Sequence, residues 1–269
     1  SQNNFNILKS LPNLYFMESE SGMLACGDEG KGKLPEVRSI IEVIPLLSNK
    51  SNAKKVLITA GATLSNIDPV RFVSNPARGG TSYLLAKKYL SEGYQVHMIQ
   101  GQDVIADFKY LSAHPNYSFE VVSTTADLLK TVTAHWAAFD IYLSPMAVSD
   151  IEFDYTDSKI KKSTLGGSFS FKFAPDVLKF VVENKQPHQQ IVGFAAESDL
   201  SENTIKEKIT RKPVDLLVAN LVNSGFNHKA KQGFGTRSGH YKLVTKNSVE
   251  EFPNLGKGEL VEKIFALIK

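Results

Sequence analysis

Residues 55–61 of the chain read KVLITAG, and this stretch decides the fold. The run is apolar, rich in β-branched side chains and closed by a glycine, which is typical of a strand buried on both faces of a parallel sheet. Similar runs recur along the chain, separated by segments with apolar residues three and four positions apart. This alternation predicts an α/β fold with a doubly wound, mostly parallel, Rossmann-like sheet and helices on both faces. The expected strands occupy 95–100, 118–122, 140–148, 190–196 and 214–219, and the expected helices occupy 82–92, 126–138, 176–184, 200–212 and 260–268.

The bulk composition excludes several classes of protein. With 269 residues, 42% of them hydrophobic, the chain can bury a large core. A net charge of +3 without a dense basic tract argues against a nucleic-acid partner. No apolar run approaches the roughly 20 residues that span a bilayer, and the polar start at 1–4 has no signal-peptide character, so no membrane partner is expected. The single cysteine, Cys26, cannot form an internal disulfide. We therefore expect a soluble cytoplasmic protein.

Two connections, 61–81 and 149–167, are unusually long, and both leave from the carboxyl ends of expected strands. In an open α/β sheet the ligand crevice lies at those ends. The glycine that closes the first strand allows close approach of a phosphate to backbone N–H groups, and the small residues before the helix at 82 would place an anion at a helix N-terminus. The dinucleotide pattern G-x-G-x-x-G is absent. The predicted phosphate or substrate ligands are Gly61, Ala62, Thr63, Gly79, Gly80 and Thr81.

The segments 58–63 (ITAGAT) and 67–75 (IDPVRFVSN) resemble the opening of the phosphopantothenate–cysteine ligases. The resemblance implies that Asn75 handles an acyl-nucleotide intermediate, whereas the residues alone also allow a turn-forming role before Pro76. Family members usually continue with an S-S-G-x-x-G run. This chain has ARGGTS at 77–82 instead, so the phosphate cradle is expected to differ in detail.

Two further phrases extend the resemblance. The segment 144–150 (SPMAVSD) is similar to the family's A-A-V-A-D strand end, which implies nucleotide contacts for Asp150 and, through the neighbouring backbone, Met146. The segment 159–162 (KIKK) matches the family's flap, in which Lys159 acts on the activated intermediate. A mobile lysine arriving as a lid would stabilise the charge that develops there. Which of Lys159, Lys161 and Lys162 acts is left open.

Three later phrases follow in the family's order, at 173–177 (FAPDV), 191–197 (IVGFAAE) and 218–220 (VAN). Lys208 and Lys212, four positions apart in the expected helix at 200–212, coincide with lysines of the family that contact the nucleotide. The residues also have ordinary structural interpretations: Asp176 could cap a helix, Phe194 could pack in the core, and the two lysines could belong to a solvated helix face. Leu221 stands where the family has an aspartate. The resemblance implies nucleotide contacts for Ala174, Pro175, Asp176, Val177, Phe194, Lys208 and Lys212, and a substrate contact for Asn220.

The front of the chain differs in kind. Residues 22–36 are similar to the end of the FMN-dependent phosphopantothenoylcysteine decarboxylases, including an A-C-G motif in which Cys26 matches the redox cysteine. A buried structural cysteine is the alternative. The flavin-binding strands and the P-x-M-N motif are absent, so FMN is expected only in a complete decarboxylase domain. We expect a decarboxylase remnant with a linker at 1–50 and a ligase domain at 51–269.

The resemblance implies a ligase that joins 4′-phosphopantothenate to L-cysteine through an acyl-cytidylate, using CTP and Mg²⁺, and that forms a homodimer. Such chemistry depends mainly on positioning and charge neutralisation. No metal ligand is identified, and the choice of CTP over ATP rests on the fused bacterial arrangement. The alternatives are a nicotinamide-dependent oxidoreductase of similar fold and a non-catalytic paralogue.

Overall fold

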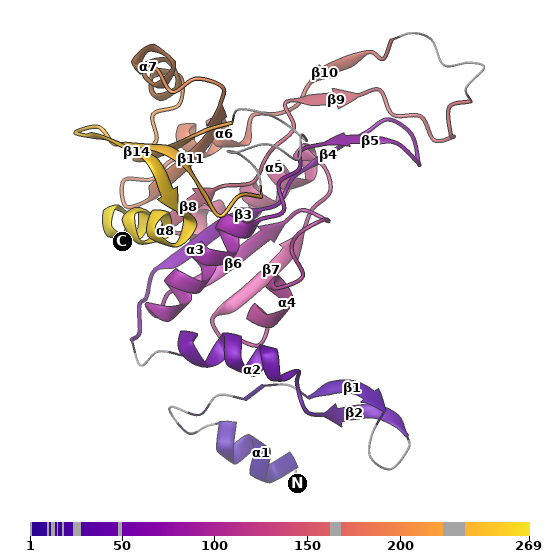
Figure 1. Cartoon of the computed structure of the whole chain (residues 1–269). Helices are drawn as coiled ribbons and strands as arrows, with labels where there is room; N and C mark the ends of the chain where they lie inside the picture. Colours follow the sequence, from indigo (N-terminus) through magenta and orange to yellow (C-terminus); the bar gives the residue numbers. More distant parts are fainter. Residues whose placement is uncertain are drawn as a thin grey trace.

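The computed structural model describes residues 2–9, 11, 14, 16–17, 19–23, 28–47, 50–161, 168–222 and 235–269. Its centre is an eight-stranded sheet (Figure 1). From one edge to the other, the strands are β14 (Val249–Gly256), β13 (Ser238–Val244), β12 (Leu216–Leu221), β11 (Gln190–Glu197), β8 (Ile141–Ser144), β3 (Lys55–Ala60), β6 (Gln95–Gln100) and β7 (Tyr117–Val121). The six strands from β12 to β7 are parallel, which confirms the predicted α/β class. The antiparallel β13 and β14 at one edge were not predicted.

The parallel strands have the doubly wound order. Numbered along the chain, they lie in the spatial order 3-2-1-4-5-6 from β7 to β12, so the direction of winding reverses between β3 and β8. Ligands of such sheets bind outside the carboxyl ends of the strands at this reversal. The structure therefore places the ligand crevice at the ends of β3 and β8, where the two long connections begin.

Helices cover both faces of the sheet. One face carries α3 (Gly80–Ser91) and α8 (Lys257–Leu267), and the other carries α5 (Thr125–His135) and α6 (Val177–Glu183). Alternation along β3 supplies both cores, since Ile58 packs with the first pair of helices and Leu57 with the second. Leu217 of β12 belongs to a third cluster with Ile205 of α7 (Glu202–Arg211).

Two of the predicted elements are shorter in the structure than expected. The segment expected to be helical over 126–138 is α-helical only as far as His135, and its last three residues form the 3₁₀ turn η2 (Trp136–Ala138). The strand expected over 140–148 ends at Ser144, because the following residues leave the sheet to pair with the connection after β3.

Both long connections contain hairpins where the sequence predicted loops. The first holds β4 (Leu64–Asn66) and β5 (Phe72–Ser74). The second holds β9 (Ile151–Phe153), which pairs with β10 (Phe171–Phe173) just beyond the predicted end of that connection. The two hairpins contact each other through β4 and β9 and project together from the sheet (Figure 1). We call residues 64–74 together with 151–161 and 168–173 the arm.

The front of the chain contains α1 (Gln2–Lys9), β1 (Glu20–Met23), β2 (Glu29–Lys33), α2 (Val37–Val43) and the 3₁₀ turn η1 (Ile44–Leu46). The end of this part packs on the body. Glu42 accepts hydrogen bonds from the Tyr83 hydroxyl at 2.9 Å and the Lys87 ammonium at 2.7 Å, and Leu46 is buried in the main core. These contacts hold α2 against α3 and join this part of the chain to the main core. The short α4 (Phe108–Leu111) lies beside α2.

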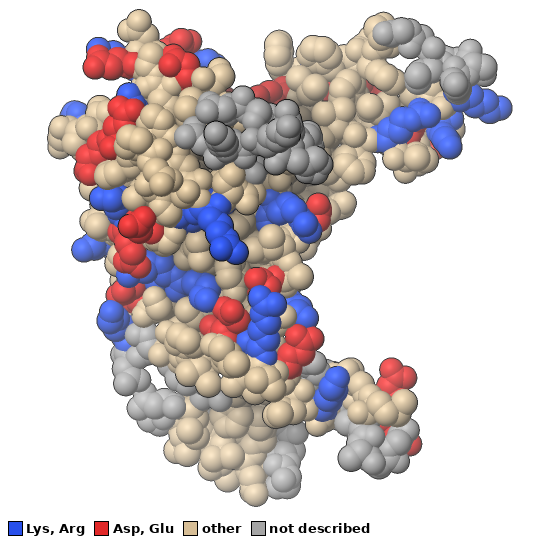
Figure 2. All heavy atoms as spheres, viewed as in Figure 1, with Lys and Arg blue, Asp and Glu red and all other residues tan. Residues whose placement is uncertain are grey.

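Charged side chains of both signs are interspersed over the face shown in Figure 2, in keeping with a net charge of +3. The outline of the molecule is concave between the projecting arm and the front of the chain. Of the described helices, none combines the length and the apolar character that crossing a membrane requires.

Candidate active site

The connections after β3 and β8 are joined at the switch point. The N–H of Ala147 donates to the carbonyl of Gly61 at 2.9 Å, and the N–H of Thr63 donates to the carbonyl of Ala147 at 3.2 Å. Gly61 has a φ of 82°, a left-handed conformation that glycine adopts without strain. The two connections thus continue the parallel pairing for a few residues beyond the sheet before they diverge into the arm.

A buried group of four hydroxyls fixes this junction. The hydroxyl of Thr63 is 3.0 Å from that of Thr125 and accepts the N–H of Ser149 at 2.8 Å. The Ser65 hydroxyl is 2.8 Å from the Ser149 hydroxyl and also donates to the carbonyl of Ile151. Because buried polar groups are costly unless paired, these bonds hold the first turns of both connections and the start of α5 in one arrangement.

This arrangement gives Thr63 a structural position. Its side chain is fully buried, and both its N–H and its hydroxyl are engaged inside the protein. Its predicted role as a phosphate ligand remains a prediction, as do those of Gly61 and Ala62.

The remaining predicted phosphate ligands, Gly79, Gly80 and Thr81, lie at the start of α3. Gly79 is the N-cap residue with a φ of 79°, and no side chain caps the helix. A Cβ on Gly79 would lie 3.0 Å from the Phe108 ring and 3.2 Å from the Gly61 nitrogen, so glycine is required by space as well as by conformation. Helix N-termini attract anions through their free N–H groups and the helix dipole.

A lysine that the sequence analysis missed lies beside this helix end. Lys257, the first residue of α8, places its Nζ 3.9 Å from the position of a Cβ on Gly80. Burial lowers the pKa of this ammonium group. In the described part of the chain no carboxylate pairs with it. Sequence alone could not find this residue, since α8 follows α3 by more than 160 positions and no motif marks the lysine.

Several predicted nucleotide ligands meet on the α6 side of the crevice. The N–H of Ala174 donates to the carbonyl of Asp150 at 2.9 Å, which brings the exposed Asp150 next to the start of α6. Asp176 caps α6 by accepting the N–H of Lys179 at 3.0 Å, and its other oxygen is 2.7 Å from Nζ of Lys212. Pro175 lies between Ala174 and Asp176 and is half-buried.

The Asp176 carboxylate is held in its charged form. Partial burial works to raise its pKa, but the hydrogen bond from Lys212, the N–H of Lys179 and the charges of Lys212 and Arg211 outweigh it, so the pKa is below its ordinary value. Lys208 is engaged in a similar way, with its Nζ 2.6 Å from a carboxylate oxygen of Glu197 at the end of β11. Both predicted lysines therefore line the same rim, each paired with a carboxylate.

The other predicted ligands of the nucleotide and the substrate are distributed between the core and the opposite face. The side chains of Met146 and Val177 are buried in the core beneath α5 and α6. Phe194 packs against the core of the opposite face, and the alternation along β11 and β12 directs Asn220 to that same face. Phe194 and Asn220 therefore share the α3 side of the crevice with Lys257. The predicted nucleotide contacts of Met146, Val177 and Phe194 and the predicted substrate contact of Asn220 remain predictions.

The two predicted catalytic residues, Asn75 and Lys159, both belong to the arm region, and both are exposed. Asn75 directly follows β5 at the base of the first hairpin, where the Ser74 hydroxyl donates to the Thr63 carbonyl at 2.9 Å. The segment that carries Lys159 lies at the tip of that hairpin. The base and the tip are separated by about four residues of extended chain, or roughly 13 Å. Within one chain the structure therefore does not bring these two residues together.

Asp68 attaches the Lys159 segment to the tip. Its carboxylate accepts the N–H of Val70 and Arg71, both at 2.8 Å, and the N–H of Ile160 at 3.2 Å. The Arg71 guanidinium is 2.9 Å from the same carboxylate and donates to the Ile160 carbonyl at 3.2 Å. Burial of the fully covered carboxylate works to raise its pKa, yet the three N–H groups and the guanidinium lower it below its ordinary value.

Two of the residues named from sequence, Cys26 and Lys162, lie outside the described residues. Lys161 is described and exposed.

The comparisons with known proteins agree with this architecture. A model of the DNA/pantothenate metabolism flavoprotein C-terminal domain matches residues 51–269. The coenzyme A biosynthesis bifunctional protein CoaBC of Bacillus subtilis (strain 168) is 33% identical over 265 residues, which cover 94% of this chain and 63% of that protein. The chain thus spans less than two thirds of the length of this relative.

Solved structures share the fold. The crystal structure of the C-terminal domain of a CoaBC protein is 25% identical, with a TM-score of 0.62 over 80% of this chain and 94% of that one. The DNA/pantothenate metabolism flavoprotein from Streptococcus pneumoniae is 22% identical, with a TM-score of 0.65 over 80% and 97% of the two chains. These findings confirm the resemblance seen in the sequence. Because the family model covers most of its length, the chain belongs to the DNA/pantothenate metabolism flavoprotein C-terminal domain family.

Proposed function

We propose that the chain is a ligase of coenzyme A biosynthesis that joins 4′-phosphopantothenate to L-cysteine, with CTP as the activating nucleotide. The observation that carries the proposal is the family membership of residues 51–269. It is combined with an uncapped helix end at the switch point and with Lys257 beside it, with which no carboxylate of the described residues pairs. These groups suit a substrate and a nucleotide that both bear phosphates.

In the first half-reaction, a carboxylate oxygen of 4′-phosphopantothenate would attack the α-phosphorus of CTP. The oxygen–phosphorus bond forms as the bond to pyrophosphate breaks, giving an acyl-cytidylate. Such a step needs positioning and charge neutralisation rather than a protein nucleophile. We assign phosphate binding to the start of α3 with Lys257, and the nucleotide to the rim formed by Asp150, Asp176 and Lys212.

In the second half-reaction, the cysteine amine would attack the acyl carbon, lose a proton and release CMP. Negative charge develops on the acyl oxygen during this attack, and an ammonium group placed there stabilises it. Lys159 is exposed on a segment attached to the tip of the arm, which suits a group that reaches the intermediate from outside the sheet. Asn75, at the base of the arm, is assigned to hold the intermediate.

The residues of the rim fit a metal that arrives with the nucleotide. Mg²⁺ is usually held by one or two carboxylates together with substrate phosphates and waters. Asp150 offers an exposed carboxylate beside the assigned nucleotide site, whereas Asp176 is engaged by Lys212. Bound there, Mg²⁺ would neutralise phosphate charge, and Asp150 is the residue we assign to hold it.

We further propose that two copies of the chain associate through the arm. Its strands expose several large apolar side chains, with Phe173 exposed by 84% and Phe72 by 56%. Among the described residues, its outer strands β5 and β10 each pair with one strand only, and such edges invite pairing with another chain. A second copy would bring another Lys159 segment toward the base of the first arm. Sedimentation of the parent chain and of a Phe171→Lys variant tests this, with a monomeric parent counting against it.

The activity is tested by mixing the chain with 4′-phosphopantothenate, L-cysteine, Mg²⁺ and each of the four nucleoside triphosphates. Pyrophosphate release and the mass of the product are followed. We expect phosphopantothenoylcysteine with CTP. The Asn75→Ala and Lys159→Gln variants should lose most of the rate, whereas Lys246→Gln, which changes an exposed lysine in the turn between β13 and β14, serves as the matched control.

Absence of pyrophosphate release with every nucleotide would refute the ligase proposal. Full activity in both the Asn75→Ala and the Lys159→Gln variants would refute only the assignment of these residues. Fluorescence titration with NADPH tests the oxidoreductase alternative, which the doubly wound strand order alone would allow. Instead of a short glycine turn into a helix, however, β3 is followed by the hairpin of β4 and β5.

A further inference from the structure

A cluster of two histidines and one glutamate lies away from the switch point, beside the edge strands β6 and β7. Ligand atoms of His97, Glu120 and His135 lie within 4.8 Å of one another, the one such group found among the described residues. His97 pairs in register with Ser118 across β6 and β7, and Glu120 follows two residues later on the same face. His135 is the last residue of α5, which covers that face. Three separate elements thus converge on one point.

The Nε2 atom of His97 is unusual. Among side-chain nitrogens and oxygens of the described residues, it is the one that is buried without a hydrogen-bond partner. His97 is only 9% exposed, and its Nε2 lies 3.4 Å from a carboxylate oxygen of Glu120, too poorly aligned for a hydrogen bond. Leaving a buried polar atom unpaired normally costs free energy, so such an atom indicates a missing partner.

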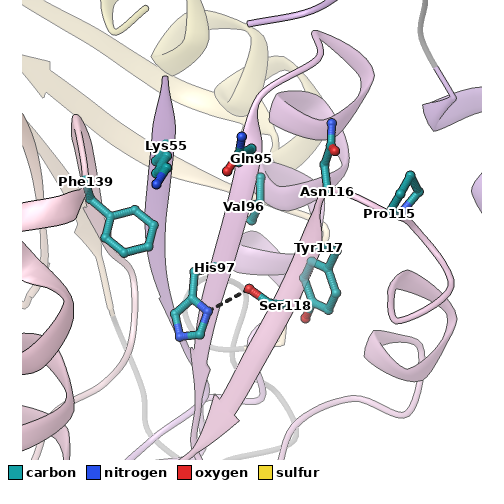
Figure 3. Close-up of a pocket in the computed structure, with 9 residues that line it drawn as sticks. All are labelled: Lys55, Gln95, Val96, His97, Pro115, Asn116, Tyr117, Ser118 and Phe139. Atoms are coloured by element: carbon teal, nitrogen blue, oxygen red, sulfur yellow. Dashed lines mark hydrogen bonds between the residues drawn. The ribbon is translucent and has the colours of Figure 1, made fainter. Parts of the chain in front are cut away.

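The opposite side of the same ring is held firmly. Nδ1 of His97 is 2.8 Å from the hydroxyl of Ser118, the bond drawn in Figure 3. In the tautomer in which Nδ1–H donates to the Ser118 hydroxyl, Nε2 carries the lone pair and faces the carboxylate of Glu120. Metal-binding histidines are commonly oriented in this way by a hydrogen bond to the second ring nitrogen.

We propose that His97, His135 and Glu120 form a Zn²⁺ site, with Nε2 of each histidine and a carboxylate oxygen as ligands. Two imidazoles and one carboxylate suit Zn²⁺ better than Mg²⁺ or Ca²⁺, which prefer oxygen ligands. Around a tetrahedral zinc the ligand atoms lie about 3.3 Å apart. The 3.4 Å between His97 and Glu120 already matches this spacing, while the 2.5 Å between Nε2 of His135 and Glu120 must open on binding.

The surroundings give the ion access and leave room for a fourth ligand. The side chains of Glu120 and His135 are 47% and 33% exposed, so the metal can enter from solvent without unfolding. A cavity of about 400 Å³ is lined in part by His97, Phe139 and Tyr117 (Figure 3). A water molecule could complete the coordination from that side, as in zinc sites with three protein ligands.

The test measures Zn²⁺ binding by the full chain rather than activity, so its result is independent of the proposed ligase function. Titration calorimetry is carried out in a Cys26→Ser background, which removes the only thiol of the chain. Metal content after gel filtration and melting temperature with and without Zn²⁺ are also measured. We expect one equivalent of bound Zn²⁺ and a higher melting temperature.

Three variants and one control locate the site. His135→Gln and Glu120→Gln, both at partly exposed positions, should each weaken binding at least about tenfold. Ser118→Ala should weaken it by about 10-fold to 100-fold through the orientation of His97. His240→Gln removes a histidine that lies 2.7 Å from Glu251 at the other edge of the sheet, and it should bind Zn²⁺ like the parent.

The absence of saturable binding in the parent would overturn the proposal. So would unchanged affinity in both His135→Gln and Glu120→Gln, since the bound ion would then lie elsewhere. Circular dichroism of each variant without metal separates a lost site from a lost fold. If one of these two variants does not fold, the other decides.

Discussion

The carboxylate of Asp68 accepts a hydrogen bond from the N–H of Ile160 at 3.2 Å, across 92 positions of the sequence. Arg71 lies on the other side of the same contact and donates to the Ile160 carbonyl. The residue after Lys159 is thereby fastened at both its N–H and its carbonyl. In our assignment, Asp68 is a positioning residue for Lys159, because it touches the segment and not the reacting atoms.

Asp68→Asn should therefore slow the ligase reaction without abolishing nucleotide binding. The amide keeps the size of the side chain but loses the charge that holds three N–H groups and a guanidinium, so the Lys159 segment becomes less well placed. Displacements of this kind cost about 10-fold to 100-fold in rate. We expect that loss in kcat with little change in KM for CTP. Asp157→Asn, an exposed neighbour in the same segment, is the control. A kcat equal to the parent's would show that the fastening is irrelevant to catalysis.

Lys257→Met should separate function from stability. The Lys257 side chain is half-buried, no carboxylate of the described residues pairs with its ammonium group, and methionine replaces most of its apolar stem. Removing it should raise the free energy of unfolding by roughly 1 kcal/mol. The same change should raise KM for a phosphorylated substrate about 10-fold to 100-fold, since a charge-assisted hydrogen bond contributes about 1.5–3 kcal/mol. Urea unfolding and steady-state kinetics measure the two effects.

The control for Lys257→Met is Lys263→Met on the same helix, where the lysine packs over the Phe252 ring at 4.3 Å. This control should leave KM unchanged. A lower stability of Lys257→Met together with unchanged KM would mean that the lysine serves the fold alone.

The parallel sheet could be predicted from sequence because each of its strands can be recognised from a short stretch of residues. An apolar run such as 55–60 is buried on both faces and needs no partner to be recognised. The hairpins of the arm gave no such signal. Phe171 and Phe173 alternate in only three residues and stay exposed, and β4 contains a buried serine whose role depends on a hydroxyl 84 positions away.

The candidate site was predictable to the extent that family phrases mark it. The sequence placed Asp150, Asp176 and Lys212 in one site, and the structure places them along one rim. It could not show that Lys212 and Asp176 pair, nor that Lys257 lies beside α3, because both relationships arise from the crossing of elements distant in the chain. The His97 cluster has the same origin, since its three residues are spread over 39 positions and three elements.

We expect substitution by alanine to have opposite effects on stability at two glycines, Gly101 and Gly258. A Cβ on Gly101 would lie 2.2 Å from the carbonyl oxygen of Ala62, so Gly101→Ala must push the connections after β6 and β3 apart. We expect a loss of about 1–3 kcal/mol in the free energy of unfolding. A Cβ on Gly258, in the first turn of α8, meets nothing within 4 Å, and Gly258→Ala should add about 0.5–1 kcal/mol. Urea unfolding of both variants measures the two changes in the free energy of unfolding. Equal changes would contradict the argument from the space around each glycine.

Because of His114, we expect the folded protein to lose stability at mildly acidic pH. Its ring is 4% exposed, Nε2 lies 3.2 Å from the carbonyl of Leu46, and Nδ1 accepts the N–H of Asn116 at 3.2 Å. These two bonds require the neutral ring, since a proton on Nδ1 would face the N–H of Asn116. Burial accordingly lowers the pKa of His114, although the Leu46 carbonyl opposes that shift.

The sign of the effect follows from proton binding. The folded pKa of His114 lies below the unfolded value of about 6.5, so between the two the unfolded chain binds more protons and stability rises with pH. As the pH falls below about 6.5, the chain should lose about 1.4 kcal/mol for each unit that separates the two values, until the folded pKa is reached. Urea unfolding between pH 7.5 and 5 should show a smaller loss in His114→Gln than in the parent, while His188→Gln, which removes an exposed histidine, should follow the parent. If stability depended on pH equally in the parent and in His114→Gln, His114 would take up its proton in the folded protein as readily as in the unfolded chain. One of its two hydrogen bonds would then be broken in solution.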